Sequence, residues 1–232
     1  MVNLDNNHLR IDRFLAIHFL IAVNVGWLVL ALINHTVAFQ LTLDDKIIQW
    51  LQFLFLLASA FYFYRLGRKH AKKDRVIAFG FFVLLFFTVI LALEEISWGQ
   101  RIFDIPTPDF IKSVNVQNEI NLHNHEDFQR YRHWLLLLFS CAGLCLICLR
   151  ERGTPGRLSF FIPPHFLKAA FTLVLISGVF MEIGYLYYYL SPDEIARKFR
   201  FAAGRYAEIG ELGVCIAAFS YAYERCRKVI GN

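Results

Sequence analysis

The chain has 232 residues, of which 57% are hydrophobic and 19% are charged, and its mean hydropathy is +0.44. A soluble globular domain is about 45–50% apolar and about 25% charged, so this composition excludes an ordinary soluble domain, and it also excludes a disordered chain. The formal net charge is +5, but the basic residues lie in short segments between long apolar blocks. That placement is typical of membrane topology signals, and we expect no nucleic-acid partner.

Six apolar segments are long enough, or nearly long enough, to cross a bilayer core, which needs about 20 helical residues. They are Phe14–Asn34, Ile47–Tyr64, Val76–Glu95, Trp134–Leu149, Leu167–Leu190 and Tyr206–Tyr223. The fourth segment is short, and we expect it to extend backwards through Asp127–His133. The pattern predicts an all-α fold: a polytopic transmembrane helical bundle of about six spans, forming a single membrane domain over residues 1–232.

The five cysteines offer no sign of a disulfide framework or a zinc finger, because no CxxC pair lies in a loop. They are Cys141, Cys145, Cys148, Cys215 and Cys226. The first three share one helix face. We interpret them as small packing residues, with a soft-metal site as the alternative.

The distribution of basic residues predicts the orientation of the spans. Of the 24 Lys and Arg residues, 15 fall on the side that carries both chain ends and the second and fourth loops, and nine fall on the other side. The positive-inside rule therefore places both termini in the cytoplasm. We expect a multi-pass protein of the bacterial inner (plasma) membrane.

The longest connection between spans is the stretch 96–133, which this orientation makes an extracytoplasmic loop. A connection of this length is usually functional or locally folded. Thr107, Pro108 and Asp109 indicate a helix start, with Thr107 as the cap. The helix would carry Phe110, Ile111 and Val114 on one side, which predicts a short helix lying in the membrane interface.

Ionisable residues inside membrane spans are costly, and they mark candidate functional sites. In this chain the charged residues within the spans are acidic, apart from Lys168 at the start of the fifth span: Glu94, Glu95, Glu182, Glu208 and Glu211. With a rise of about 1.5 Å per helical residue, the predicted orientation places all five in the outer half of the membrane. Acidic residues from three separate spans therefore reach one level on one side.

Two histidines, His123 and His125, lie in the outer loop at the same level. Several buried carboxylates cannot all stay ionised without compensation. A divalent metal ion, bound protons, or an arginine such as Arg101 or Arg205 could supply it. Carboxylates combined with imidazoles suit zinc, iron or manganese better than calcium, so we name a divalent metal ion as the expected cofactor.

The string Glu94-Glu95-Ile96-Ser97-Trp98-Gly99-Gln100-Arg101, then Asn121-Leu122-His123-Asn124, then a Glu-rich last span, resembles a family of uncharacterised bacterial multi-span membrane proteins. The resemblance covers the chain from the third span onwards. It implies a membrane location and brings no activity with it. A looser analogy exists with alkaline ceramidases and adiponectin receptors, which also gather ligands at helix ends, although their ligand pattern is not reproduced here.

Three hypotheses of function follow from these residues. The first is a metal-dependent membrane hydrolase of a lipid or lipid-linked substrate, with Glu94 or Glu95 as general base. Its candidate ligands are His123, His125, Glu182, Glu208 and Glu211. The second is a cation or proton channel or transporter lined by the acidic residues. The third is a non-catalytic membrane partner protein. The expected partners are the lipid bilayer, a lipid substrate and further copies of the chain in a homo-oligomer.

Overall fold

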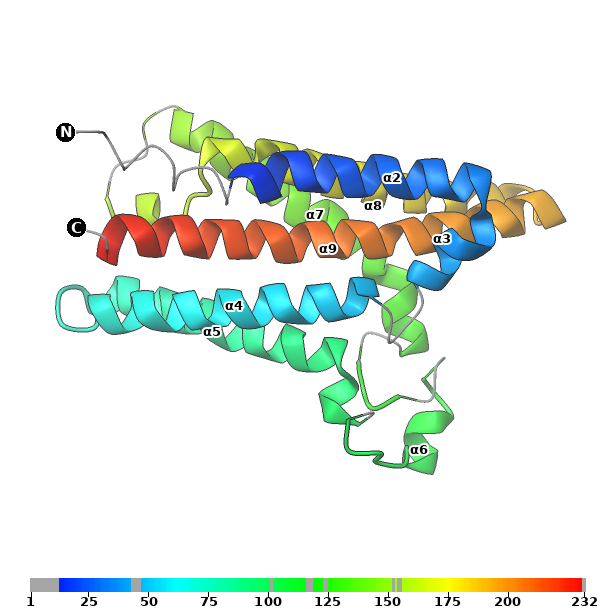
Figure 1. The fold of residues 1–232 in the computed structure, drawn as a ribbon, viewed down its shortest axis with the longest axis horizontal. Helices are drawn as coiled ribbons and strands as arrows, with labels where there is room; N and C mark the ends of the chain where they lie inside the picture. Colours follow the sequence, from blue (N-terminus) through cyan, green and yellow to red (C-terminus); the bar gives the residue numbers. More distant parts are fainter. Residues whose placement is uncertain are drawn as a thin grey trace.

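The computed structural model describes residues 13–42, 47–100, 102–115, 119–122, 125–151, 153 and 156–230. Within these residues the secondary structure is helical, apart from a single antiparallel bridge between Asn115 and His125. The predicted all-α class is therefore confirmed. The long helices pack side by side into a bundle, with their axes along its longest dimension (Figure 1).

The main helices, in chain order, are α2 (Leu20–Ile33), α3 (His35–Leu41), α4 (Ile47–His70), α5 (Arg75–Glu95), α6 (Asp109–Lys112), α7 (Glu126–Glu151), α8 (Lys168–Leu190) and α9 (Glu194–Ile230). A π-helical turn at Leu15–Phe19 leads into α2, and 3₁₀ turns lie at Ser97–Gly99, Arg157–Phe160 and His165–Leu167. As expected, α7 begins well before the apolar run at Trp134.

Side-chain caps account for two of the helix starts. Asp74 has an extended backbone, and its Oδ1 accepts hydrogen bonds from the N–H groups of Val76 (3.0 Å) and Ile77 (3.3 Å). These bonds satisfy N–H groups that have no partner within a helix. At Asn34 the backbone leaves the helical region, and the side chain accepts from Val37 N–H at 3.2 Å. The first apolar segment therefore divides into α2 and α3.

Five helical segments are long and apolar enough to cross a membrane: Ala16–Ile33, Ile47–His70, Arg75–Glu95, Tyr131–Leu149 and His165–Leu190. Their outward faces carry exposed apolar side chains, such as Leu32 (88% exposed) and Phe79 (70% exposed), as expected of surfaces that face lipid. These features indicate a multi-pass membrane protein. The sixth predicted span falls within α9, which is less apolar than the other five.

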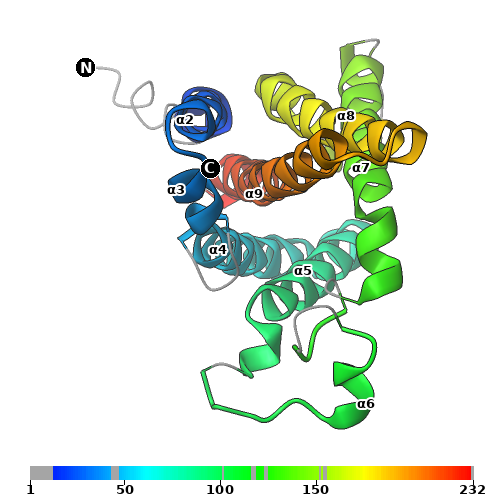
Figure 2. The same ribbon diagram turned by 90° about the vertical axis from the view of Figure 1, so that its right-hand side faces the viewer.

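The position of α9 explains its composition. Figure 1 shows α9 along the whole length of the molecule, and the end-on view in Figure 2 places it in the middle of the bundle. It packs most extensively against α8 and α4. Because none of residues 203–227 is exposed, this part of α9 can carry polar residues that a lipid-facing helix could not.

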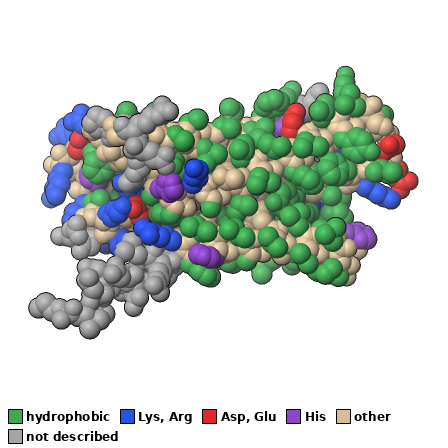
Figure 3. All heavy atoms as spheres, turned by 90° about the horizontal axis from the view of Figure 1, so that it is seen from above, with side chains coloured by type: hydrophobic (Ala, Val, Ile, Leu, Met, Phe, Trp, Pro, Cys, Tyr) green, Lys and Arg blue, Asp and Glu red, His purple; other side chains and the backbone are tan. Residues whose placement is uncertain are grey.

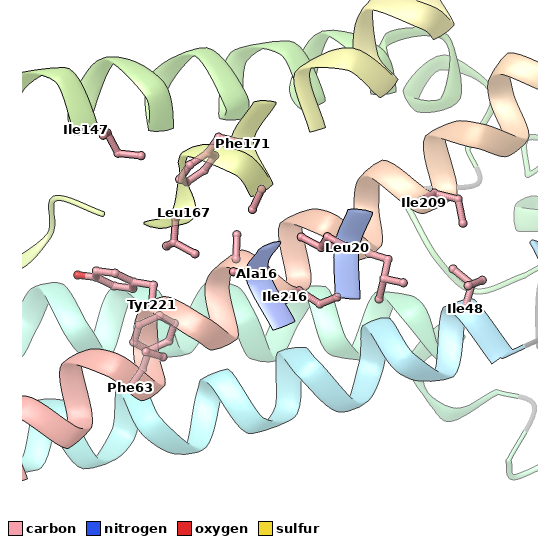
Figure 4. Packing of buried hydrophobic residues seen from close by; sticks show 14 of the residues in the cluster. Ala16, Leu20, Ile48, Phe63, Ile147, Leu167, Phe171, Ile209, Ile216 and Tyr221 are labelled. Carbon is pink, nitrogen blue, oxygen red and sulfur yellow. The ribbon is translucent and has the colours of Figure 1, made fainter. Parts of the chain in front are cut away.

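Small residues allow α9 to approach its neighbours closely. A Cβ atom added at Gly210 would lie 1.9 Å from Ser177 Oγ, and one added at Gly213 would lie 2.9 Å from Val174 Cγ2. These glycines of α9 thus pack directly against α8. Beside it, a core of large apolar residues from several helices fills the interior, including Leu20, Phe63, Leu167, Phe171 and Ile216 (Figure 4).

Charged side chains gather at the two ends of the bundle, and an apolar band lies between them. Figure 3 shows this band on the face formed by α2, α7 and α8, with many of the Lys and Arg side chains at the end where α9 finishes. α2 begins in the half of the molecule that contains this end and runs away from it (Figure 1). The loop that contains α6 lies at the opposite side, displaced sideways beyond α5 rather than across the end of the bundle (Figures 1 and 2).

Candidate functional site

The predicted acidic residues divide among separate contacts. Glu208 and Glu211 contact Arg132, Glu182 contacts His133, and Glu94 binds the loop that follows its own helix. The fifth, Glu95, lies near enough to the Cys215 thiol to influence it electrostatically, as does Glu211. The structure thus places Glu95 of α5 and Glu211 of α9 near the same thiol, that of Cys215. Glu94 instead contacts the loop that follows α5.

Arg132, near the start of α7, is the centre of an ion cluster with α9. Its Nη1 lies 2.8 Å from Glu208 Oε1 and its Nε lies 3.2 Å from Glu211 Oε1. Nη2 also donates to the carbonyl of Gly204 at 3.4 Å. The Arg132 side chain is only 12% exposed, and those of Glu208 and Glu211 are 18% and 20% exposed. A buried arginine therefore supplies compensation for two of the carboxylates.

A cavity of about 180 Å³ adjoins this cluster between α7, α8 and α9, and three of its lining residues are arginines: Arg132, Arg200 and Arg205. Arg200 lies over the rings of Tyr188 (4.2 Å) and Tyr185 (5.5 Å). Among the described residues, neither Arg200 nor Arg205 contacts a carboxylate. The cavity wall therefore carries more positive than negative charge.

Arg205 is held by contacts that leave its charge uncompensated. Its Nη1 donates to the carbonyl of Thr42 at 3.2 Å, and its guanidinium lies over the ring of Phe201 at 5.3 Å. Glu208 is the one carboxylate among the residues that line the cavity. A carbonyl and an aromatic ring position a cation without neutralising it.

His133, the residue after Arg132, makes a second contact with α8. Its Nε2 lies 2.6 Å from Glu182 Oε2, and its ring stacks on Tyr185 with the ring centres 5.1 Å apart. His133 is 4% exposed, whereas the Glu182 side chain is 39% exposed. Tyr185 also lines the arginine cavity, so this pair lies beside the cavity with one ring between them.

The motif that follows α5 folds into an unusual turn. Ser97, Trp98 and Gly99 all have positive φ values of 48°, 56° and 80°. This conformation costs L-residues with a side chain about 1–2 kcal/mol each. Hydrogen bonds hold the turn in place: Trp98 Nε1 donates to Glu94 Oε1 at 2.6 Å, and Ser97 Oγ donates to Glu119 Oε2 at 2.6 Å.

The second half of the motif closes onto this turn. Asn121 Nδ2 donates to Glu119 Oε2 at 2.6 Å, and Leu122 N–H donates to Glu94 Oε2 at 2.6 Å. Ile120 N–H donates to Gln100 Oε1 at 2.6 Å. We call this network, formed by Glu94, Ser97, Trp98, Gln100, Thr107, Asn115, Glu119, Ile120, Asn121 and Leu122, the loop clasp. Its two acidic residues, Glu94 and Glu119, are only 6% and 2% exposed.

The short helix in this loop differs from the prediction in its N-cap and in its length. Pro108, not Thr107, occupies the N-cap position of α6, and Thr107 Oγ1 instead accepts from Gln100 Nε2 at 2.6 Å. The helix has four residues, so Val114 lies beyond it. The clasp lines an apolar cavity of about 490 Å³, in which Glu94 and His125 are the ionisable residues.

The predicted metal site receives no direct support from these contacts. Within the ranges that the structure describes, no three residues among His, Cys, Asp and Glu lie together in a way that could hold a metal ion. His123 and Arg101 lie outside the described residues, and His125 lines the same apolar cavity as Glu94. The divalent metal ion therefore stays a prediction.

Arg132, His133 and Glu119 were not among the predicted site residues. A signal existed for the first two: the fourth span was expected to extend backwards through His133, and this extension brings Arg132 to membrane depth, where a charge is a functional candidate. Glu119 gave no such signal, because a single acidic residue in a loop is usually solvated.

At the other end of the bundle, Asp74 joins two loops. Its Oδ2 accepts from Arg157 Nε at 2.7 Å, while its Oδ1 caps α5. The hydrogen bond from Arg157, and those from the N–H groups of Ile77 and Val76, hold the pKa of Asp74 below its ordinary value. The connection between α7 and α8 is thereby tied to the start of α5.

Comparisons with known protein families, with curated proteins and with solved structures find no match. The fold and contacts described above define the class of the protein as an all-α, multi-pass membrane bundle.

Proposed function

We propose that the protein binds the anionic, phosphate-bearing headgroup of a lipid or lipid-linked molecule in the cavity lined by Arg132, Arg200 and Arg205. The observation that carries this proposal is the excess of arginine in a small cavity between three helices. Guanidinium groups suit phosphate because they offer several N–H donors in a planar fork.

The contacts of the arginines support an anionic ligand. Arginine carries five N–H donors. Among the described residues, Arg132 donates hydrogen bonds to Glu208 and Gly204, and its contact with Glu211 is an ion pair without a hydrogen bond. Arg200 is placed by two tyrosine rings, which leave its donors available. A cation stacked on aromatic rings keeps its charge for a further partner.

The size of the cavity supports a headgroup rather than a whole molecule. A volume of about 180 Å³ corresponds to roughly six water molecules at about 30 Å³ each. This is below the range of about 300–1,000 Å³ that is usual for complete small-molecule ligands. A phosphate group fits such a space, and the rest of the ligand would extend into the bilayer beside the helices.

The proposed location is the outer leaflet of a bacterial inner membrane, with both chain ends in the cytoplasm. The distribution of Lys and Arg supports this orientation, because 15 of 24 lie on the side of the chain ends. The arginine cavity lies near the first residues of α9 and the last residues of α8, at the opposite end. Tyr187, Tyr188 and Tyr189 at the end of α8 are typical of the headgroup level.

The test is binding of a water-soluble dioctanoyl phosphatidate to the purified full chain. We expect Arg200→Gln with Arg205→Gln to weaken binding at least tenfold, because a hydrogen bond to a charged group contributes about 1.5–3 kcal/mol. The matched control is Arg197→Gln with Lys198→Gln, which removes two exposed charges from the same helix. Equal affinities of both double variants would contradict the proposal. Inorganic phosphate binding as tightly as the phosphatidate would contradict the assignment to a lipid.

A further inference from the structure

A separate groove lies in the half of the bundle that contains the chain ends, between the start of α2 and the start of α8. Its volume is about 470 Å³, within the range of ordinary ligand sites. Ile17 and Ile21 form one wall, and Phe166, Ala169 and Leu173 form the other. Both walls belong to candidate membrane spans, so the groove lies where an acyl chain would be its natural occupant.

Cations border the apolar walls. Lys168 lines the groove itself, and the guanidinium of Arg13 lies 5.8 Å from the centre of the Phe166 ring. Both residues are exposed, and neither contacts a carboxylate among the described residues. Figure 3 shows that Lys and Arg side chains gather at this end of the molecule. Two cations beside an apolar groove match the two parts of an anionic lipid.

We propose that this groove binds one anionic phospholipid from the leaflet on the side of the chain ends, with an acyl chain between α2 and α8 and its phosphate beside Arg13 and Lys168. Basic pockets between membrane helices on the cytoplasmic side are suited to anionic headgroups. Few contacts join α2 directly to α8. The bound lipid would therefore complete the packing of α2 on the bundle.

This site is independent of the arginine cavity, because it lies at the opposite end and shares no residue with it. An anionic lipid in the groove would act as a structural partner of α2. A ligand in the arginine cavity would be recognised by α7, α8 and α9. Loss of either site by mutation should leave the other intact.

The test is native mass spectrometry of the detergent-purified chain with added phosphatidylglycerol or phosphatidylcholine. We expect the wild type to prefer phosphatidylglycerol, and Arg13→Gln with Lys168→Gln to reduce that preference by about thirtyfold, since each cation contributes about 1 kcal/mol and about 1.4 kcal/mol corresponds to tenfold. The control, Lys72→Gln with Lys73→Gln, removes two exposed cations from the same end of the bundle and should keep the preference. Equal preference in the two double variants would overturn the proposal.

A second variant tests the acyl chain. Ala169→Phe places a ring in the groove, and we expect it to reduce binding of both lipids at the site while the fold, followed by circular dichroism, is retained. Unchanged occupancy in Ala169→Phe would show that the groove is not the place of binding and would overturn the proposal.

Discussion

Arg132 provides the counter-charge for two neighbouring carboxylates of α9. Glu208 and Glu211 are three residues apart, so they share a helix face. Their attraction to Arg132 offsets the cost of removing three charges from water. The cluster is therefore expected to be sensitive to removal of one member and tolerant of removal of all three.

Replacement of Arg132 should destabilise the protein strongly. We expect Arg132→Met to lower the free energy of unfolding by about 3–5 kcal/mol, because it leaves two carboxylates uncompensated. Adding Glu208→Gln and Glu211→Gln to this variant should recover most of the loss. The measurement is the unfolding midpoint of the detergent-purified protein, and a wild-type midpoint for Arg132→Met alone would show that the cluster does not need the arginine.

The contacts of Asp74 predict that the protein loses stability in acid. Its pKa is held below the ordinary value by Arg157 and two backbone N–H groups. Asp74 therefore stabilises the fold above its unfolded pKa of about 3.9, and this contribution is lost as the pH falls through the lower, folded value. Arg157→Gln should lower the unfolding midpoint at pH 7 and reduce its change between pH 5 and pH 2.

The control for this experiment is Asp109→Asn, which removes an exposed carboxylate at the other side of the protein. It should leave the acid-dependent change as in the wild type. An Arg157→Gln profile that runs parallel to the wild type over the whole pH range would rule out the contribution of Asp74.

Among the structural elements, the turn after α5 combines strain with an extensive hydrogen-bond network. Three consecutive residues with positive φ persist only where the surroundings determine their conformation, and here the clasp provides those surroundings. The carboxylates of Glu94 and Glu119 each accept two hydrogen bonds from the clasp. The motif that first suggested catalysis therefore has a structural task, which is to fix the loop against α5.

Substitution of Gly99 tests the conformation of this turn most directly. Its φ is 80°, and an added Cβ would lie 3.1 Å from carbon atoms of the Phe103 ring. We expect Gly99→Ala to destabilise the clasp by about 1–2 kcal/mol. The amide protons of Ile120 and Leu122 should then exchange about tenfold faster in hydrogen-exchange measurements.

Gly26→Ala is the matched substitution in α2, where no heavy atom lies within 4 Å of the added Cβ and the backbone has no positive φ. It should leave exchange in the clasp unchanged. If Gly99→Ala also leaves the exchange of Ile120 and Leu122 unchanged, the turn does not depend on glycine.

Most of the helical elements could be predicted from the sequence, because apolar runs of membrane length have few alternative structures. The start of α5 at Arg75 and the end of α8 at Leu190 agree closely with the predicted spans. The contacts between elements could not be predicted in the same way. The depth of a glutamate follows from residue counting, but its partner depends on helix rotation and packing, so Arg132 was missed as the partner of Glu208 and Glu211.

For the molecule as a whole, the uneven distribution of Lys and Arg predicts its orientation in the membrane. We expect a single cysteine at position 72, in a background without the native cysteines, to react with a membrane-impermeant maleimide only after the cells are opened. A single cysteine at position 109 should react in intact cells. Both native residues, Lys72 and Asp109, are exposed. The reverse labelling pattern would overturn the orientation and exchange the leaflets assigned to the two proposed lipid sites.

The central position of α9 has a consequence for how the protein is made. This helix is synthesised after the five apolar helices around it, and each charged residue within an isolated membrane helix opposes its insertion. Glu208 and Glu211 therefore make the insertion of α9 on its own unfavourable. Arg132 of α7 is already in the membrane when α9 is synthesised, and its positive charge lowers the free-energy cost of inserting Glu208 and Glu211. We therefore expect α9 to insert last, against helices that are already in place.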